Sequence, residues 1–347
     1  MLTLNNKVII YAQDSFGDES AKTAVGFIKY ALCETVAIVD RKLANKNASE
    51  IVKGLPPVPI YDSIEKAKEA HSSADVLIVG IATTGGEFPL EWLPDMKKAI
   101  LLRLNIVNGL HDYLSDVKEI NKLSQDCGVF IWDVRKVDKK FPVANARLLD
   151  YPIKVILTVG TDGAIGKMTV ALELTKKARL KGMSAKFIAT GQTGMMISGE
   201  GVPVDAIRGD FMAGAVEQEI IKASKSNHKI AFVEGQGSIL HPGWSGVTLA
   251  LLHGALPHKL ILCHKVKRKF LKNTKIRIES LNQFIKVYES MSLPLRLSKV
   301  VGIGLNTDGL NDVECKEEIK NLERETGLPV DDPVRLGCER LINACLK

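Results

Sequence analysis

Two α/β domains, each built on a parallel sheet, are predicted for this chain by three observations. The sequence has 347 residues, which is long for one core, since domains of about 150 to 200 residues are the norm. Short apolar, β-branched runs alternate with helix-patterned segments, as in parallel sheets with helical crossovers. A glycine-rich loop pattern starts at Gly160, directly after one such run. We therefore expect domains at 1–140 and 141–347.

The composition is that of a folded, soluble protein. Apolar residues make up 46% and charged residues 25% of the chain, which disfavours disorder. The N-terminus lacks a leader pattern, and no window reaches the roughly 18 unbroken apolar residues of a membrane span. The six cysteines are dispersed without zinc-site spacing, so we expect no metal site. The expectation is a cytoplasmic homo-oligomer that acts on a small molecule and binds neither membranes nor nucleic acid.

The first domain is expected to be Rossmann-like. Its apolar runs lie at 7–12, 35–39, 75–81, 99–104 and 129–132. The loop after the first run offers only Gly17 in place of the G-x-G-x-x-G fingerprint, so dinucleotide binding is not predicted. Asp40, at the end of the second run, either holds a ribose hydroxyl or is a helix cap or solvated loop residue. His111, at the tip of the loop 108–116, is either a substrate-binding residue or a structural one.

A charged, poorly periodic stretch at 133–151 is interpreted as the linker to the second domain. Strands are then predicted at 154–159, 185–190, 229–234, 259–264 and 300–306, with a closing helix around 333–346. The carboxyl ends of parallel strands meet at one edge of a sheet, where ligands bind. The loops at these strand ends therefore hold the candidate site.

The string VGTDGAIGKMTVALEL has the pattern of a P-loop, because it follows a strand and opens a helix. Its glycines let successive backbone N–H groups surround an anion, and Lys167 adds a charge beside the positive end of the helix. The expected phosphate-binding residues are Gly160, Thr161, Asp162, Gly163, Ala164, Ile165, Gly166, Lys167, Met168 and Thr169.

This loop departs from the common form G-x-x-x-x-G-K-[ST] in two ways. Five residues separate Gly160 from Gly166, and Met168 stands where the magnesium-binding hydroxyl is usual. Thr169 would need a shifted turn to reach a metal. Phosphate binding remains predicted, whereas classical Mg-ATP hydrolysis becomes doubtful.

Two further strand ends carry polar groups. The glycine-rich loop 189–210 exceeds the usual loop length and is therefore expected to be functional. Its substrate-binding candidates are Gln192, Thr193, Asp205 and Arg208. Arg208 either pairs with a substrate anion or forms a salt bridge with Asp205 or Asp210.

The strand end VEGQGSILHPG supplies the catalytic candidates Glu234 and His241, together with Lys167 of the P-loop. Glu234 is a general base, a structural group or a metal ligand. Gln236 and Ser238 in the same string are substrate-binding candidates, and Asn306, after the last strand, is a candidate for an adenine contact.

The densest basic stretch, His264 to Arg277, contains a single aromatic residue, Phe270. A solvated loop, an anion-attracting rim over the P-loop and a nucleic-acid surface are the three interpretations, and the last is the least supported because bases have little to stack on.

Several motifs resemble known proteins. GTDGAIGKMT and VEGQGS are similar to the P-loop and a strand end of dethiobiotin synthetase, an ATP-dependent enzyme. A resemblance over nearly the whole chain is to the DgcN-type family, formerly a domain of unknown function, and it is carried by GTDGAIGKMT, ATGQTGMM, DFMAGAVEQ, VEGQGSILHP, VNGLHDYL and FIWDVRK.

The characterised branch of that family is D-glutamate N-acetyltransferase. The resemblance implies an acyltransferase in which the P-loop holds a phosphate of acetyl-CoA, Glu234 or His241 deprotonates the amine, and Arg208 or the basic stretch meets the acidic substrate. Two alternatives stay open: a ligase or carboxylase that uses ATP with magnesium, and a protein that senses a nucleotide or CoA.

Overall fold

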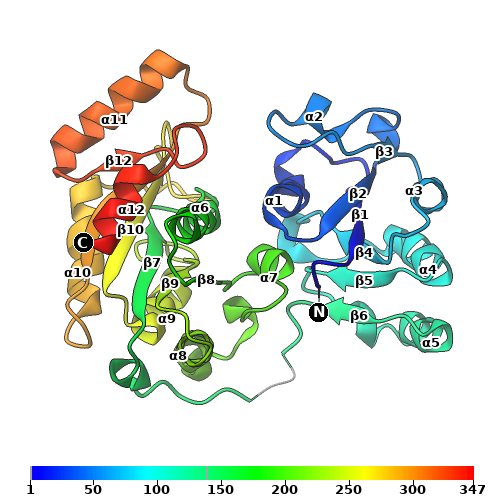
Figure 1. Cartoon of the computed structure of the whole chain (residues 1–347), viewed down its shortest axis with the longest axis horizontal. Coiled ribbons are helices and arrows are strands. Elements are labelled where there is room, and N and C mark those ends of the chain that lie inside the picture. The colour runs from blue at the N-terminus through cyan, green and yellow to red at the C-terminus, as the bar shows by residue number, and fades with distance from the viewer. Residues whose placement is uncertain (1, 138–139) are drawn as a thin grey trace. The chain divides into compact units, whose positions relative to one another are not determined.

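The computed structural model describes residues 2–137 and 140–347, which form two α/β units (Figure 1). The first unit precedes residue 138 and also takes in Met195–Glu200, whereas Gly201–Lys347 and the residues from 140 to Gly194 belong to the second. Within these described ranges, no helix combines the length and apolar character that crossing a bilayer needs.

The first unit is Rossmann-like. Its six parallel strands run in the order β3-β2-β1-β4-β5-β6 (Figure 1). The strands are β1 Lys7–Tyr11, β2 Glu34–Val39, β3 Ile60–Tyr61, β4 Val76–Val79, β5 Asn105–Asn108 and β6 Ile131–Asp133, and the helices are α1 Lys22–Tyr30, α2 Ala48–Ile51, α3 Ile64–Ala70, α4 Leu93–Leu101 and α5 Lys118–Cys127.

Central strand β1 shows why the apolar run folds this way. Val8, Ile9, Ile10 and Tyr11 are all fully buried, so both faces of the strand are covered, as in a parallel sheet between helices. Ile9 and Tyr11 join the core that includes side chains of α3, α4 and α5.

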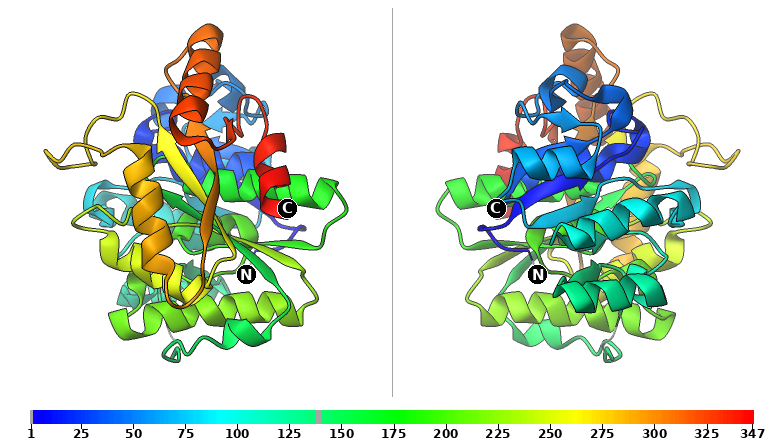
Figure 2. Two further views of the ribbon diagram at one scale, coloured as in Figure 1. Left: turned by 90° about the vertical axis from the view of Figure 1, so that its left-hand side faces the viewer. Right: turned by 90° about the vertical axis from the view of Figure 1, so that its right-hand side faces the viewer.

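The second unit is a P-loop domain with six parallel strands in the order β12-β11-β10-β7-β9-β8. Helices α6 and α12 contact one face of the sheet, and α8, α9 and α10 contact the other (Figure 2). The strands are β7 Lys154–Gly160, β8 Ala185–Ile188, β9 Ile230–Val233, β10 Lys259–Lys265, β11 Lys299–Asn306 and β12 Val330–Asp331, and the helices are α6 Lys167–Leu180, α8 Gly209–Lys225, α9 Ser245–Ala255, α10 Leu281–Ser292, α11 Asp312–Thr326 and α12 Glu339–Leu346. Helix α7, Gln192–Ser198, is divided between the two units at Met195.

The structure differs from the sequence expectations in four places. The run 99–104 contains the end of α4, at Leu101, and a turn, and the strand follows at β5. The long loop 189–210 contains α7, and the short strands β3 and β12 were not predicted. The closing helix starts at Glu339, later than expected. Short apolar runs fit a buried helix turn as well as a strand, so pattern alone did not separate them.

Candidate active site

The P-loop joins β7 to α6. Ala164 and Gly166 have positive φ, at 54° and 107°, and Ile165 between them does not. Such alternation turns successive N–H groups toward one point, where an anion can bind. None of the side chains that the structure describes caps the N-terminus of α6, so the first turn keeps donors for a ligand.

The other two glycines of the loop lie close to side chains. A Cβ on Gly160 would lie 2.8 Å from Cδ1 of Ile165, and a Cβ on Gly163 would lie 2.5 Å from Cζ3 of Trp244. The loop is therefore pressed against its own apolar residue on one side and against an indole on the other.

Lys167, the first residue of α6, is buried in the loop with 6% of its surface exposed. Its Nζ donates to the carbonyl oxygen of Asp162 at 2.6 Å. Burial lowers the pKa of this ammonium to about 8, against the opposing effect of Cys263, Asp162 and Glu234. The side chain is therefore mostly charged at neutral pH and poorly hydrated, which suits it to bind phosphate.

Asp162 is fully buried and ties the P-loop to the basic stretch. Its Oδ1 accepts from Gly163 N at 2.7 Å, and its Oδ2 accepts from Lys272 N at 2.9 Å and from Arg268 Nη1 at 3.0 Å. Thr161 Oγ1 lies 2.9 Å from Nδ1 of His264. The basic stretch thus borders the P-loop, and the Asp162 carboxylate is engaged by protein donors.

Tyr288 of α10 forms hydrogen bonds with the start of the P-loop, a contact that sequence patterns did not reveal. Its hydroxyl donates to Gly160 O at 2.7 Å and accepts from Ile239 N at 3.1 Å. Burial raises its pKa to about 12, so it stays protonated. The distance of 128 residues between Tyr288 and Gly160 leaves no local signal of this bond.

Met168 and Thr169 occupy the first turn of α6 and are partly buried. Across the described part of the chain, no group of three or more His, Cys, Asp or Glu side chains is arranged to hold a metal ion.

Glu234, which follows β9, is buried with 5% exposure. Its Oε2 accepts from the backbone N–H groups of Thr190 and Gly191, at 2.9 and 3.1 Å. Burial raises its pKa to about 7, although these two hydrogen bonds and the charge of Lys167 oppose the rise. A carboxyl group with this pKa is divided between its acid and base forms at neutral pH, as a general base requires.

Two glycines make room for the strand-end side chains. A Cβ on Gly194 would lie 2.4 Å from Oε2 of Glu234, and a Cβ on Gly191 would lie 2.4 Å from Nε2 of Gln236. Nε2 of Gln236 also donates to Thr190 Oγ1 at 3.3 Å. The segments GQTG and VEGQG are therefore closely packed against each other.

His241 has both ring nitrogens engaged. Nδ1 accepts from Gly243 N at 3.1 Å, and Nε2 lies 2.9 Å from Lys272 O, to which it donates in that tautomer. The ring also stacks on Trp244, with centroids 3.8 Å apart. These contacts favour a structural role over proton transfer, and Ser238 nearby is fully buried.

The remaining candidates of the glycine-rich segment lie around α7. Gln192 and Thr193 begin this helix and are partly buried. The charge of Asp205 acts on Glu234 and raises its pKa. Arg208 is exposed at the start of α8, and no salt bridge joins it to Asp205 or Asp210, all three being described residues. The structure thus leaves the Arg208 guanidinium accessible to a ligand.

Asn306 ends β11 beside the basic stretch. Its Oδ1 accepts from Asp308 N at 3.0 Å, and its carbonyl oxygen accepts from Val266 N at 3.1 Å. The side chain shapes the turn after the strand, and its partly buried position leaves part of it open to a ligand.

Two candidates belong to the first unit. Asp40 is fully buried, and its carboxylate accepts from four backbone N–H groups, those of Ser15, Phe16, Lys42 and Leu43. This favours a capping role over a ribose contact. His111 is exposed, and its backbone N–H donates to Gly86 O at 2.7 Å. A Cβ on Gly86 would collide with its ring, at 2.1 Å from Cδ2.

Two family descriptions match this sequence. "Domain of unknown function (DUF1611_C) P-loop domain" matches residues 142–342, and "Domain of unknown function (DUF1611_N) Rossmann-like domain" matches residues 41–137. The crystal structure of a DUF1611 family protein from Anabaena variabilis covers 99% of each chain with 40% identity and a TM-score of 0.93.

Two curated relatives are each 35% identical to the chain. The protein from Tritonibacter scottomollicae aligns over 288 residues, which is 81% of this chain and 84% of its own length. The protein from a Pseudoalteromonas species aligns over 284 residues, 80% of this chain and 83% of its own length. Both are named D-glutamate N-acetyltransferase.

Proposed function

The chain belongs to the DUF1611 family, and from this premise we propose that it is an acetyl-CoA-dependent N-acetyltransferase whose acceptor is an acidic amino acid, D-glutamate. One observation carries the proposal: a buried carboxyl group, Glu234, with a pKa of about 7 stands within electrostatic range of a phosphate-binding lysine. The names of the two curated relatives support the same reaction.

The P-loop fits the phosphates of CoA. The uncapped start of α6 and the buried Lys167 form a site for a pyrophosphate. A magnesium-binding hydroxyl after the lysine is needed for nucleotide hydrolysis but not for holding an acyl carrier. Met168 at that position is therefore compatible with acyl transfer.

In the proposed reaction, the amine nitrogen of the acceptor forms a bond to the thioester carbonyl carbon, and the carbon–sulfur bond breaks. One proton leaves the nitrogen, and the departing sulfur takes up one proton. Glu234 accepts the amine proton in this scheme. The N–H groups of Thr190 and Gly191 already bind Glu234, so they orient the base.

Arg208 is the cation proposed for the acidic acceptor. It is exposed at the start of α8 and lies three residues after Asp205, whose charge reaches Glu234. A guanidinium can bind a carboxylate through two parallel hydrogen bonds. The exposed position of Arg208 therefore suits a substrate that arrives with two carboxylates.

The proposal predicts thiol release that depends on the amine. Purified protein with acetyl-CoA should release free CoA thiol when D-glutamate is supplied and should not do so without it. A thiol-reactive dye follows the reaction, and mass spectrometry identifies the acetylated amino acid. L-glutamate and D-aspartate are the matched controls for stereochemistry and chain length. Thiol release that is indifferent to every amino acid would contradict the proposal.

The pH dependence should be bell-shaped. Glu234 must lose its proton to act as a base, so kcat/KM for acetyl-CoA should rise with pH through about 7. Lys167 must keep its proton to bind phosphate, so the same parameter should fall above about 8. Steady-state kinetics at saturating D-glutamate measures both limbs, and a profile that is flat from pH 6 to 9 would contradict both assignments.

An ATP-dependent ligase or carboxylase is the second candidate, and the P-loop is the observation that favours it. It predicts that ATP with magnesium yields ADP in the presence of a carboxylate substrate. Met168→Thr would then restore the usual magnesium-binding hydroxyl and raise turnover. Tight binding of CoA or a nucleotide without any product would instead favour a sensing protein.

A further inference from the structure

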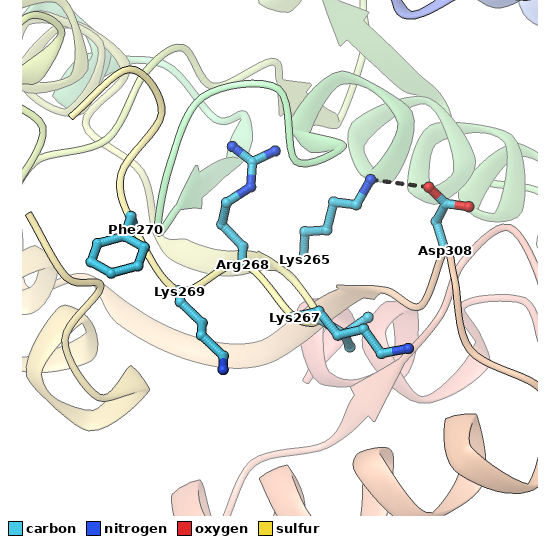
Figure 3. Close-up of a pocket in the computed structure, with 7 residues that line it drawn as sticks. Lys265, Lys267, Arg268, Lys269, Phe270 and Asp308 are labelled. Atoms are coloured by element: carbon cyan, nitrogen blue, oxygen red, sulfur yellow. Dashed lines mark hydrogen bonds and ion pairs between the residues drawn. The ribbon is translucent and has the colours of Figure 1, made fainter. Parts of the chain in front are cut away.

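An open basic groove of about 450 Å³ follows strand β10 in the second unit (Figure 3). Its lining comes almost entirely from one continuous segment, with a single residue from the turn after β11. The lining residues are Lys265, Val266, Lys267, Arg268, Lys269, Phe270 and Asp308.

Charges in the groove do not balance. Lys265 Nζ pairs with Asp308 Oδ2 at 3.0 Å, and Arg268 Nη1 pairs with Asp162 Oδ2 at 3.0 Å. Lys267 Nζ donates to Gly309 O at 2.9 Å, which leaves its charge uncompensated because a carbonyl is neutral. Lys269 is exposed and forms no ion pair with any residue that the structure describes. Two positive charges therefore remain.

The side chains of the two uncompensated lysines extend in other directions than that of Arg268. Lys267 and Lys269 both point away from Arg268 (Figure 3), so their ammonium groups take no part in its contact with the P-loop. Lys267 also has a φ of 60°, a left-handed conformation that is unfavourable for a residue with a Cβ. Glycine would adopt this backbone conformation more easily, but the chain has a lysine at this position.

The groove and the P-loop belong to the same edge of the sheet. Strands β7 and β10 pair in parallel, and their carboxyl ends lead into the P-loop and the groove. The contacts of Asp162 with Arg268 and Lys272 then join the two segments. Two groups of donors suited to anions therefore lie at this edge, one at the start of α6 and one at Lys267 and Lys269.

Two separate anion sites would distinguish phosphorylated carriers by the positions of their phosphates. ATP carries its phosphates as one chain on a single ribose position. CoA carries a pyrophosphate on one ribose position and a phosphomonoester on another. A phosphomonoester has a charge of about −1.5 to −2 at pH 7, which matches the two uncompensated lysines.

We propose that Lys267 and Lys269 bind the 3′-phosphate of the acetyl-CoA substrate while the P-loop binds its pyrophosphate. This inference rests on the proposed function. Under this proposal, the groove distinguishes CoA from nucleotides that lack a 3′-phosphate. The ion pairs of Lys265 and Arg268 hold the groove in place.

Calorimetric titration of the full-length protein with CoA and with 3′-dephospho-CoA tests the assignment. We expect wild type to bind CoA about tenfold more tightly or better, the effect of losing one charge-assisted contact. The double variant Lys267→Gln, Lys269→Gln should lose that preference and bind dephospho-CoA as wild type does. Lys275→Gln, an exposed lysine of the same stretch outside the groove, is the matched control and should behave as wild type.

The outcomes separate the two proposals. Equal binding of CoA and dephospho-CoA by wild type, with D-glutamate acetylated from both donors, overturns the groove assignment and leaves the proposed function standing. A double variant that loses affinity for both compounds equally, at an unchanged melting temperature, also overturns the groove assignment. Binding of neither compound by wild type, with no acetyl transfer, overturns both proposals.

Discussion

A Glu234→Gln enzyme should lose about 100- to 10,000-fold in kcat, the usual contribution of a positioned general base. The glutamine keeps the shape of the side chain, and its carbonyl oxygen can still accept from the N–H groups of Thr190 and Gly191. It cannot take a proton from the acceptor amine. Steady-state kinetics with acetyl-CoA and D-glutamate measures the loss.

The controls separate catalysis from folding. The melting temperature and the calorimetric affinity for acetyl-CoA should stay close to wild type, because the P-loop is untouched. The rising limb of the pH profile near 7 should disappear with the carboxyl group. Glu317→Gln, on the exposed surface of α11, makes the same chemical change far from strand β9 in the sequence and should have no effect. Turnover within about threefold of wild type would assign Glu234 a purely structural role.

A Gly235→Ala chain should be destabilised by roughly 3 kcal/mol or more, toward the upper end of effects from steric overpacking. An added Cβ would lie 1.7 Å from the carbonyl oxygen of Thr158 and 3.1 Å from Cδ of Lys167. The Thr158 contact involves backbone of strand β7, so relief requires strands β7 and β9 to move apart. Urea-induced unfolding followed by circular dichroism measures the change.

Gly246→Ala is the matched control for this variant. Gly246 lies in α9, and a Cβ there would meet no atom within 4 Å. Alanine is favoured over glycine inside a helix by about 0.5 to 1 kcal/mol, so this variant should be slightly more stable than wild type. A Gly235→Ala chain as stable as wild type would show that β9 is not pressed against β7 at this point.

The fold was largely predictable because its signals are local. The run at Lys7–Tyr11 is apolar on both faces, and that pattern indicates a parallel strand wherever it occurs. Prediction was wrong at 99–104, where α4 ends and β5 has not begun. Leucine and isoleucine suit a buried helix turn as well as a strand, and only packing against α5 and the sheet separates the two.

The roles of single side chains were less predictable than the loops that carry them. His241 follows a strand end as a catalytic histidine can, yet its two nitrogens bind Gly243 and Lys272. Tyr288 carries no motif, yet it anchors Gly160 from across the unit. These partners lie up to 128 residues away in the sequence, so only the folded chain brings them together.

By itself the sequence determined the two α/β units, the phosphate loop and the strand ends where polar groups gather. These features follow from contiguous residues, because strand patterning, glycine spacing and helix starts are local properties of the backbone. Only the tertiary structure decided how each polar side chain is used. Burial raises the pKa of Glu234 and lowers that of Lys167, and it commits Asp162 to Arg268 and Lys272, since desolvation and hydrogen bonding depend on segments that meet only after folding.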